Sequence, residues 1–256
     1  MTEQEPSPHT SARYDRIGNN YAQFRFTEPT WLEAIDAALG DAATVLNIGA
    51  GTGNYEQQDR FVASIEPSRT MLGQRRSNRA SATQAVAEAL PFADDAFDAT
   101  MGVLTMHHWR DRHRGLEEAA RVAQHHVFTV YEKVTHAMWL VEYFPESLAL
   151  DMEVDPPTAS FIDEVLKVVD EQILWVPADC QEGFAAASWA RPHDYLDPAK
   201  QRAISCLAML PDHVRAAGTE RLRADLDSGK WHAKHGHLLE MDKADFGYRL
   251  VTARRR

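Results

Sequence analysis

Three glycines at alternate positions are the first part of the sequence that could do chemistry. Gly49, Gly51 and Gly53 directly follow an apolar, β-branched run at 44–48. Glycine lets a backbone turn sharply and approach a ligand closely, and a helix that starts after such a turn would add its free N–H groups to the site. The G-x-G-x-G spacing differs from the G-x-G-x-x-G of dinucleotide-binding proteins and from the phosphate loop, so it disfavours a dinucleotide dehydrogenase.

A carboxylate follows the next apolar run along the chain. Glu66 comes directly after residues 61–65 and precedes Pro67. An acidic side chain at the carboxyl end of a strand, one βα unit beyond a glycine loop, can accept hydrogen bonds from both hydroxyls of a ribose. Taken alone, Glu66 would also be plausible as a helix cap or a solvent-facing residue. Its position after the glycine loop favours a nucleoside-binding site.

Two histidines and a tyrosine end later apolar runs. His107 and His108 follow residues 97–103, and Tyr131 closes the run at 126–131. Open α/β sheets bind their ligands at the carboxyl ends of the strands, so these side chains are predicted to face a substrate. A histidine titrates near neutral pH and could serve as a general base. The alternatives are that the histidines only shape the pocket and that Tyr131 leads into a polar loop.

A parallel sheet is the element that would position all of these residues. Apolar runs alternate with helical patterns, which is typical of βαβ units. Pro29 marks the start of the second of two helices expected within residues 10–40. We therefore expect an α/β fold with a Rossmann-like, doubly wound, mostly parallel seven-stranded sheet. The predicted strands are 44–48, 61–65, 82–87, 97–103 and 126–131, and the predicted helices between them are 68–77 and 111–123.

The regular alternation ends after the fifth predicted strand. Residues 136–170 show helical patterns broken by prolines and are predicted to form a mobile lid over the active end of the sheet, with a static cap as the alternative. A strand-like run at 172–177 and a second helical insertion at 179–240 precede a last strand at 246–252. Pairing of the two late strands would give the sheet an antiparallel edge. The whole chain, 1–256, is predicted to be a single domain.

Composition disfavours several classes of function. The chain of 256 residues has a net charge of -11, which disfavours a nucleic-acid partner because Lys and Arg provide much of the affinity for phosphate backbones. No apolar run is long enough to span a bilayer, and the first residues do not have the pattern of a signal peptide, so a cytoplasmic protein without a membrane partner is expected. Cys180 and Cys206 cannot form a disulfide framework, and neither they nor His232, His235 and His237 predict a metal site.

Four motifs, in order along the chain, resemble those of the class I S-adenosylmethionine-dependent methyltransferases, particularly the small-molecule branch that includes the menaquinone and ubiquinone C-methyltransferases. The motifs are residues 45–53, Glu66, 87–98 and 103–109, and the resemblance covers residues 11–131. It implies S-adenosylmethionine as the cofactor, a small-molecule methyl acceptor and a Rossmann-like fold.

The resemblance also implies which residues form the site. Asn47 stands where the family commonly has Asp, and Val86 where many members have an Asp that bonds the adenine amino group. His107, His108 and Tyr131 are the candidates for catalysis, which would consist mainly of aligning the acceptor and excluding water. The implied cofactor-binding residues are Tyr14, Tyr21, Asn47, Gly49, Ala50, Gly51, Gly53, Glu66, Pro67, Ala87, Glu88 and Leu104.

The predicted lid bears on the nature of the acceptor. Its Met138, Trp139, Tyr143 and Phe144 could present apolar surface to a small, partly apolar metabolite, although aromatic residues at helical spacing more often belong to a core. Two other functions stay open at this point: a different reaction with the same cofactor, and cofactor binding without catalysis. Stoichiometric release of S-adenosylhomocysteine would distinguish methyl transfer from both.

Overall fold

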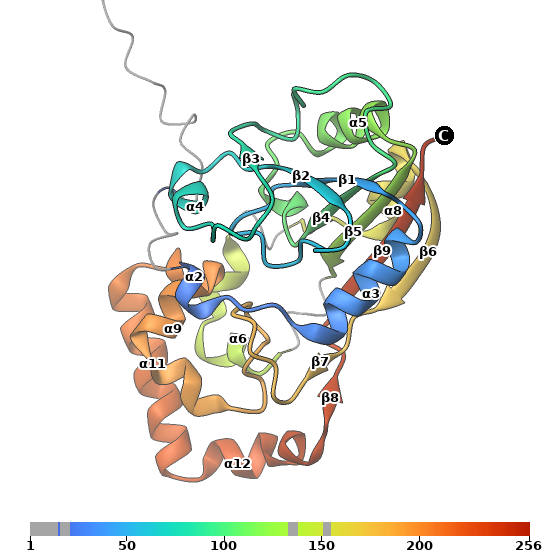
Figure 1. The fold of residues 1–256 in the computed structure, drawn as a ribbon. Coiled ribbons are helices and arrows are strands. Elements are labelled where there is room, and N and C mark those ends of the chain that lie inside the picture. Colours follow the sequence, from blue (N-terminus) through green and yellow to red (C-terminus); the bar gives the residue numbers. More distant parts are fainter. Residues whose placement is uncertain (1–14, 16–20, 133–137, 151–154) are drawn as a thin grey trace, which may run out of the picture.

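The computed structural model describes residue 15 and residues 21–132, 138–150 and 155–256, and in these ranges a seven-stranded sheet forms the centre of the protein (Figure 1). The strands follow the order β3-β2-β1-β4-β5-β9-β6 across the sheet. β9 runs antiparallel to both of its neighbours, and the other pairs are parallel. The strands are β1 (Thr44–Ile48), β2 (Phe61–Ile65), β3 (Ala82–Thr83), β4 (Ala99–Val103), β5 (His125–Tyr131), β6 (Lys167–Ile173) and β9 (Tyr248–Arg254).

The predicted fold class is confirmed, since the sheet is mostly parallel, contains an antiparallel strand and is surrounded by helices. The antiparallel strand, however, lies one place in from the edge, between β5 and β6. The edge strand β6 begins inside the segment 136–170 that was predicted as helical, and it ends within the strand predicted at 172–177. Charged and polar side chains make up much of β6, as is common in edge strands, so its sequence has no clear apolar alternation.

The two faces of the sheet bury different helices. These are α3 (Pro29–Leu39) on one face and α5 (Arg112–Val122) with α8 (Ala159–Val165) on the other. Side chains alternate between the faces along a strand, so Val45 packs in the core of α3 and Leu46 in the core of α5 and α8. In β5, Val127 packs in the core of α3 and Phe128 in the core of α5 and α8. Because both faces are covered, the central strands are largely buried, and most of their side chains are apolar.

A group of helices, the helical body, packs beside α3 and away from α5 (Figure 1). No helix of the described ranges is long and apolar enough to cross a membrane. The helical body consists of α6 (Leu140–Tyr143), η3 (Pro145–Ala149), η4 (Pro192–Leu196), α9 (Pro198–Ala203), α10 (Ser205–Ala208), α11 (Asp212–Asp227), α12 (Lys230–His235) and η5 (Gly236–Glu240), with the short strands β7 (Val176–Pro177) and β8 (Lys243–Ala244). Further short helices are α2 (Tyr21–Phe24), α4 (Arg69–Gly73) and η1 (Met106–His108).

The segment predicted as a lid divides into separate parts. α8 packs on the sheet, whereas residues 138–150 belong to the helical body. Trp139 Nε1 donates to Trp189 O at 2.9 Å, and the ring centres of Trp139 and Trp231 lie 5.2 Å apart. Met138, Tyr143 and Phe144 are buried in the same core. These side chains therefore offer no free surface to a substrate, which favours the static cap, and movement of the segment stays a prediction.

Acid should destabilise the fold through His126 in β5. Burial lowers the pKa of this side chain from 6.5 to about 3, and its Nδ1 is hydrogen-bonded to Thr100 Oγ1 at 2.8 Å. Below a pH of about 6.5 this histidine is protonated in the unfolded chain but stays neutral in the folded protein. The free energy of unfolding should therefore fall by about 1.4 kcal/mol for each unit by which the pH is lowered. Urea denaturation between about pH 7.5 and pH 5 measures this slope.

His126→Asn should reduce the slope, because the variant has no imidazole to protonate at this position, whereas His125, whose pKa burial also lowers, keeps its own contribution. The matched control is His193→Asn, which removes an exposed histidine and should leave the slope as in the wild type. If His126→Asn kept the wild-type slope, the acid sensitivity would have another origin.

Candidate functional site

A cavity opens at the carboxyl ends of β1, β2 and β4, where open α/β sheets bind their ligands. It encloses about 1210 Å³, and its wall includes the glycine loop after β1, Glu66 after β2 and Leu104 after β4. The structure thus brings together residues that were singled out in separate motifs. The predicted cofactor-binding residues in the wall are Asn47, Gly49, Ala50, Gly51, Glu66, Pro67, Ala87, Glu88 and Leu104.

The remaining predicted cofactor-binding residues are Gly53, Tyr14 and Tyr21. Gly53 supports the turn, because its N–H donates to Ala50 O at 2.9 Å. The Ala50 N–H donates in turn to Ile65 O at 2.9 Å, which ties the loop to β2. Tyr14 lies outside the described residues, and so does the side chain of Tyr21, whose backbone begins α2.

Two glycines of the loop are required for different reasons. Gly49 and Gly51 have φ angles of 70° and 53°, in the left-handed region that favours glycine. A Cβ on Gly49 would overlap the side chain of Thr105, whose own Cβ is 2.9 Å from that position. A Cβ on Gly51 would meet the flexible end of Met71, with Cε at 3.3 Å. Gly49 is therefore required by space as well as by backbone conformation, and Gly51 mainly by conformation.

Glu66 forms the wall of the cavity next to the glycine loop. Its Oε2 accepts from the Gly51 N–H and its Oε1 from the Ser68 N–H, both at 2.8 Å. Burial raises the pKa of Glu66, and the two N–H groups oppose the shift. An ionised carboxylate has about four acceptor sites, so Glu66 can accept two further hydroxyl groups while it keeps both backbone bonds.

The connection from β1 to β2, which is described throughout, contains no helix, so the expectation of a helix after the glycine loop was wrong. Residues 54–60 instead form a loop around the buried carboxylate of Glu56. Its Oε1 accepts from Ser64 Oγ at 2.7 Å and from Arg75 Nη2 at 2.6 Å, and its Oε2 accepts from the Ala80 N–H at 2.9 Å. The glycine turn and the loop around Glu56 together take up all of residues 49–60, so no continuous stretch is left for a helix between the two strands.

Buried Glu56 explains why position 47, in the motif at 45–53, is Asn and not the Asp that is common in the family. Asn47 Nδ2 donates to Glu56 Oε1 at 3.4 Å. An aspartate at position 47 would place a second carboxylate against Glu56, where little water screens the repulsion. Arg75 connects this pair to the glycine loop, since its Nη1 donates to Gly51 O at 3.1 Å. The amide of Asn47 is therefore the side chain that suits this loop.

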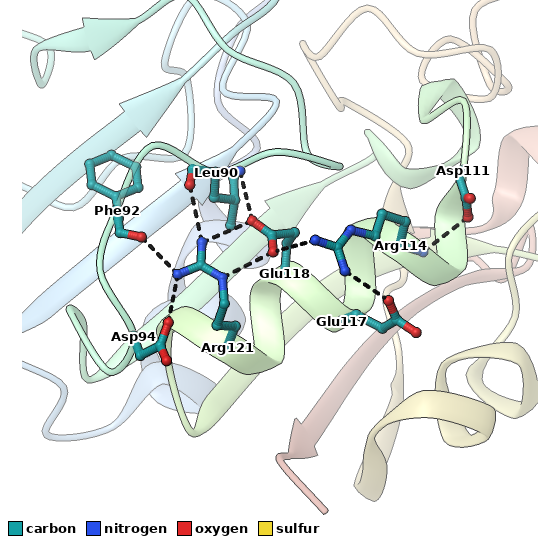
Figure 2. A network of polar contacts seen from close by, with 8 residues as sticks. All are labelled: Leu90, Phe92, Asp94, Asp111, Arg114, Glu117, Glu118 and Arg121. Atoms are coloured by element: carbon teal, nitrogen blue, oxygen red, sulfur yellow. Dashed lines mark hydrogen bonds and ion pairs between the residues drawn. The ribbon is translucent and has the colours of Figure 1, made fainter.

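A network of ion pairs and hydrogen bonds holds residues 90–94, which follow the wall residues 86–88, against α5 (Figure 2). Arg121 donates to Leu90 O at 3.1 Å and to Phe92 O at 2.8 Å. Glu118 accepts from the Leu90 N–H at 2.9 Å and pairs with Arg121 at 2.8 Å. These contacts fix the segment that follows the residues of the cavity wall.

Glu88 also stabilises the start of α5. Its Oε1 accepts from the N–H groups of Arg110 at 2.6 Å and Asp111 at 3.0 Å. Val86 lines the same part of the cavity and has no polar atom in its side chain. Hydrogen bonds from this segment to an adenine would therefore come from backbone groups such as those of Ala87, or from Glu88.

The predicted catalytic residues lie together near the end of β4. His108 lines the cavity, and its ring centre is 3.8 Å from that of His107. The His107 ring packs edge-on against Tyr131 at 5.1 Å, and buried Tyr131 lies 6.4 Å from Tyr248 of β9. Leu104 has a φ of 47°, a strained conformation that is common at functional sites.

Arg25 and Glu182 are residues of the wall that sequence reasoning missed. Arg25 Nε lies 2.6 Å from Glu182 Oε1, and both side chains line the cavity with Asn54 and Tyr55. No role was predicted for either residue, and more than half of the chain separates them. No signal in the sequence could have paired them.

Parts of the chain are similar to known methyltransferases. Residues 46–130 match a family model described as a methyltransferase domain. A putative methyltransferase from an antibiotic biosynthesis pathway of Anabaena variabilis is 28% identical, with a TM-score of 0.82 over 90% of this chain and 99% of that one.

Two more distant structures show the fold alone. The [4+2]-cyclase SpnF is 17% identical, with a TM-score of 0.51 over 94% of this chain and 93% of the cyclase. A phosphoethanolamine N-methyltransferase of Haemonchus contortus, in complex with phosphomonomethylethanolamine and S-adenosylhomocysteine, is 14% identical. Its TM-score is 0.53, over 93% of this chain and 56% of that one.

Proposed function

We propose that the chain is a class I S-adenosylmethionine-dependent methyltransferase that transfers the methyl group of its cofactor to a small-molecule acceptor, as its match to a methyltransferase domain and its similarity to a putative methyltransferase support. The observation that carries the proposal is the cavity at the strand ends, where the glycine loop, Glu66 and Ala87 meet in one wall. A nucleoside cofactor fits this arrangement, because the turn leaves room for a ligand, the carboxylate can accept hydrogen bonds from ribose hydroxyls, and a pocket lies beside them.

We assign the parts of the cofactor in the order in which these residues lie. Glu66 accepts the ribose hydroxyls, and the adenine lies by Ala87 and Glu88. The glycine loop then supports the remainder of the cofactor. Tyr14 and Tyr21 are proposed to fold over its methionine end, as the family resemblance implies.

The acceptor is proposed to be a small, partly apolar metabolite of the cytoplasm. Two observations support this class: the resemblance of the motifs to menaquinone and ubiquinone C-methyltransferases, and the antibiotic biosynthesis pathway named for the Anabaena variabilis protein. Analysis of the methylated product will identify the acceptor.

The residues of the chain contribute mainly by positioning. The cofactor supplies a methyl group on a reactive sulfonium, so alignment of the acceptor and exclusion of water account for much of the rate. His108 in the wall is placed to accept a proton from an acceptor that must lose one. The His107 ring lies against that of His108 and packs in turn on Tyr131, and we propose that these two residues help to hold the ring of His108.

Product analysis tests the proposed function. Methyl-labelled S-adenosylmethionine incubated with the protein and fractionated small-molecule extracts should yield a labelled small molecule and an equal amount of S-adenosylhomocysteine. Reaction of an extract component without release of S-adenosylhomocysteine would instead favour the second candidate, a different reaction with the same cofactor. That candidate is kept because the [4+2]-cyclase SpnF has a similar fold.

Glu66→Gln should weaken the binding of S-adenosylhomocysteine by about tenfold to a hundredfold, since a hydrogen bond to a charged group contributes about 1.5–3 kcal/mol. Calorimetric titration measures the change, with exposed Glu220→Gln on α11 as the matched control. Wild-type affinity in Glu66→Gln would place the ribose elsewhere. Tighter binding of NAD than of S-adenosylhomocysteine by the wild type would contradict the cofactor assignment itself.

A further inference from the structure

The strand β6 forms one edge of the sheet, and β9 pairs with it on its inner side only (Figure 1). The Leu174 N–H, just beyond the end of β6, donates to Tyr248 O at 3.0 Å, so the backbone of Leu174 faces β9. Backbone groups alternate in direction along an antiparallel ladder. The N–H and C=O groups of Glu171 and Ile173 therefore point away from β9, towards the free edge.

The two halves of β6 differ in how well they prevent pairing with another strand. Natural edge strands often carry charges, prolines or bulges that have this effect. The first half has a bulge between Val168 and Asp170, and its Val168 N–H already donates to Asp163 Oδ1 at 2.8 Å. Residues 172–175, in contrast, include no charged side chain, no proline and no bulge. The second half of the edge is therefore open to a further strand.

Exposed apolar side chains gather beside this open half. Eight large hydrophobic side chains are exposed in the described ranges, and five of them lie in the segments 169–175 and 239–241. The short ladder between β7 and β8 joins these two segments, since one leads into β7 and the other into β8. Ile173 is 43% exposed and Trp175 42%. A concentration of apolar surface next to free backbone groups is typical of a protein–protein contact.

We propose that a second copy of this chain binds here, with β6 paired to β6 in antiparallel orientation about a two-fold axis at Gln172. This register sets Glu171 of each copy opposite Ile173 of the other, so that their outward N–H and C=O groups bond to each other. Trp175 of one copy then lies next to Val169 of the other, which removes exposed apolar surface from water. The two sheets become one continuous sheet.

The charges at this edge are complementary to those of a second copy. Lys243 Nζ lies 5.2 Å from the ring centre of Trp175, and it forms no ion pair with any residue of the described ranges. The Glu171 carboxylate reaches Arg249 Nε only at 3.8 Å. In the proposed register Glu171 of one copy lies diagonal to Trp175 of the other and therefore faces its Lys243. The two-fold axis repeats this attraction, so each copy contributes one anion and one cation.

The mass of the full chain in solution tests the proposal. Analytical ultracentrifugation of a dilution series from the millimolar to the micromolar range should show a reversible dimer with twice the 28.8 kDa of the chain. Ile173→Glu places a carboxylate opposite Glu171 of the other copy, twice in each dimer, and should weaken dimerisation by about a hundredfold or more. The matched control is Phe61→Glu in β2, which changes a side chain that is 63% exposed and should keep the wild-type dimer. A wild type that is monomeric throughout the series, or a dimer that Ile173→Glu leaves intact, would overturn the proposal.

A charge exchange tests the register without depending on how Ile173→Glu folds. Lys243→Glu and Glu171→Lys should each weaken the dimer by about tenfold, because like charges then face each other across the interface. The double variant restores the attraction and should dimerise about as tightly as the wild type. Circular dichroism of each variant checks that the fold is kept. If the two losses were additive in the double variant, pairing about Gln172 would be refuted.

Discussion

Asn47→Asp should lower the free energy of unfolding by about 3 kcal/mol at neutral pH, because it places a second carboxylate beside buried Glu56. Asn47 is 3% exposed and Glu56 2% exposed, and the two side chains are in contact at 3.4 Å. The new aspartate would have a raised pKa in the folded state, so its cost should be present at neutral pH and shrink as the pH falls towards about 4. Urea denaturation at several pH values measures both effects.

A double-mutant cycle shows whether the two carboxylates are the cause. Glu56→Gln alone should also destabilise the fold, because buried Arg75 loses its charged partner at 2.6 Å. The double variant Asn47→Asp with Glu56→Gln has one carboxylate again and should be more stable than the sum of the single changes predicts, by more than about 1 kcal/mol. Asn78→Asp, in an exposed loop, is the control and should change stability by less than about 0.5 kcal/mol. Additive costs for positions 47 and 56 would refute the explanation.

Gly49→Ala should weaken the binding of S-adenosylhomocysteine by about a hundredfold, equivalent to about 3 kcal/mol of strain and overlap at the loop. The added Cβ would overlap the side chain of Thr105 while the backbone keeps a φ of 70°. Either the loop moves out of its binding shape or Thr105, itself part of the cavity wall, is displaced. Calorimetric titration together with circular dichroism distinguishes loss of the site from loss of the fold.

Two other glycines serve as controls for backbone strain. Gly51→Ala, at a φ of 53°, meets only the flexible end of Met71 and should bind more tightly than Gly49→Ala. Gly229→Ala, at a φ of 76° with open space around it, should lose about 1 kcal/mol of stability and no affinity. If Gly49→Ala behaved like Gly229→Ala, the contact with Thr105 would have no influence on the site.

The features that could be predicted from the sequence depend on residues that are neighbours along the chain. The runs 44–48 and 61–65 predicted β1 and β2 with the bounds that the structure has, because strands in a sheet that is covered on both faces are rich in apolar and β-branched residues. The glycine loop and Glu66 were predicted to lie at the same edge of the sheet because each directly follows its strand. Local pattern was thus sufficient for β1 and β2 and for the part of the cavity wall that directly follows them.

Features that join distant parts of the chain were decided only by the tertiary structure. Edge strand β6 has polar side chains, and its pairing with β9 comes from backbone hydrogen bonds that no side-chain pattern records. Glu56 takes its partners from β2 and from the segment after α4, so its influence on Asn47 was not visible in the first motif. Arg25 and Glu182 meet because the helical body packs against the sheet beside α3. In each case the stabilising contact joins residues that are far apart in the sequence. The spacing of residues along the chain carries no information about which distant groups will share a buried site.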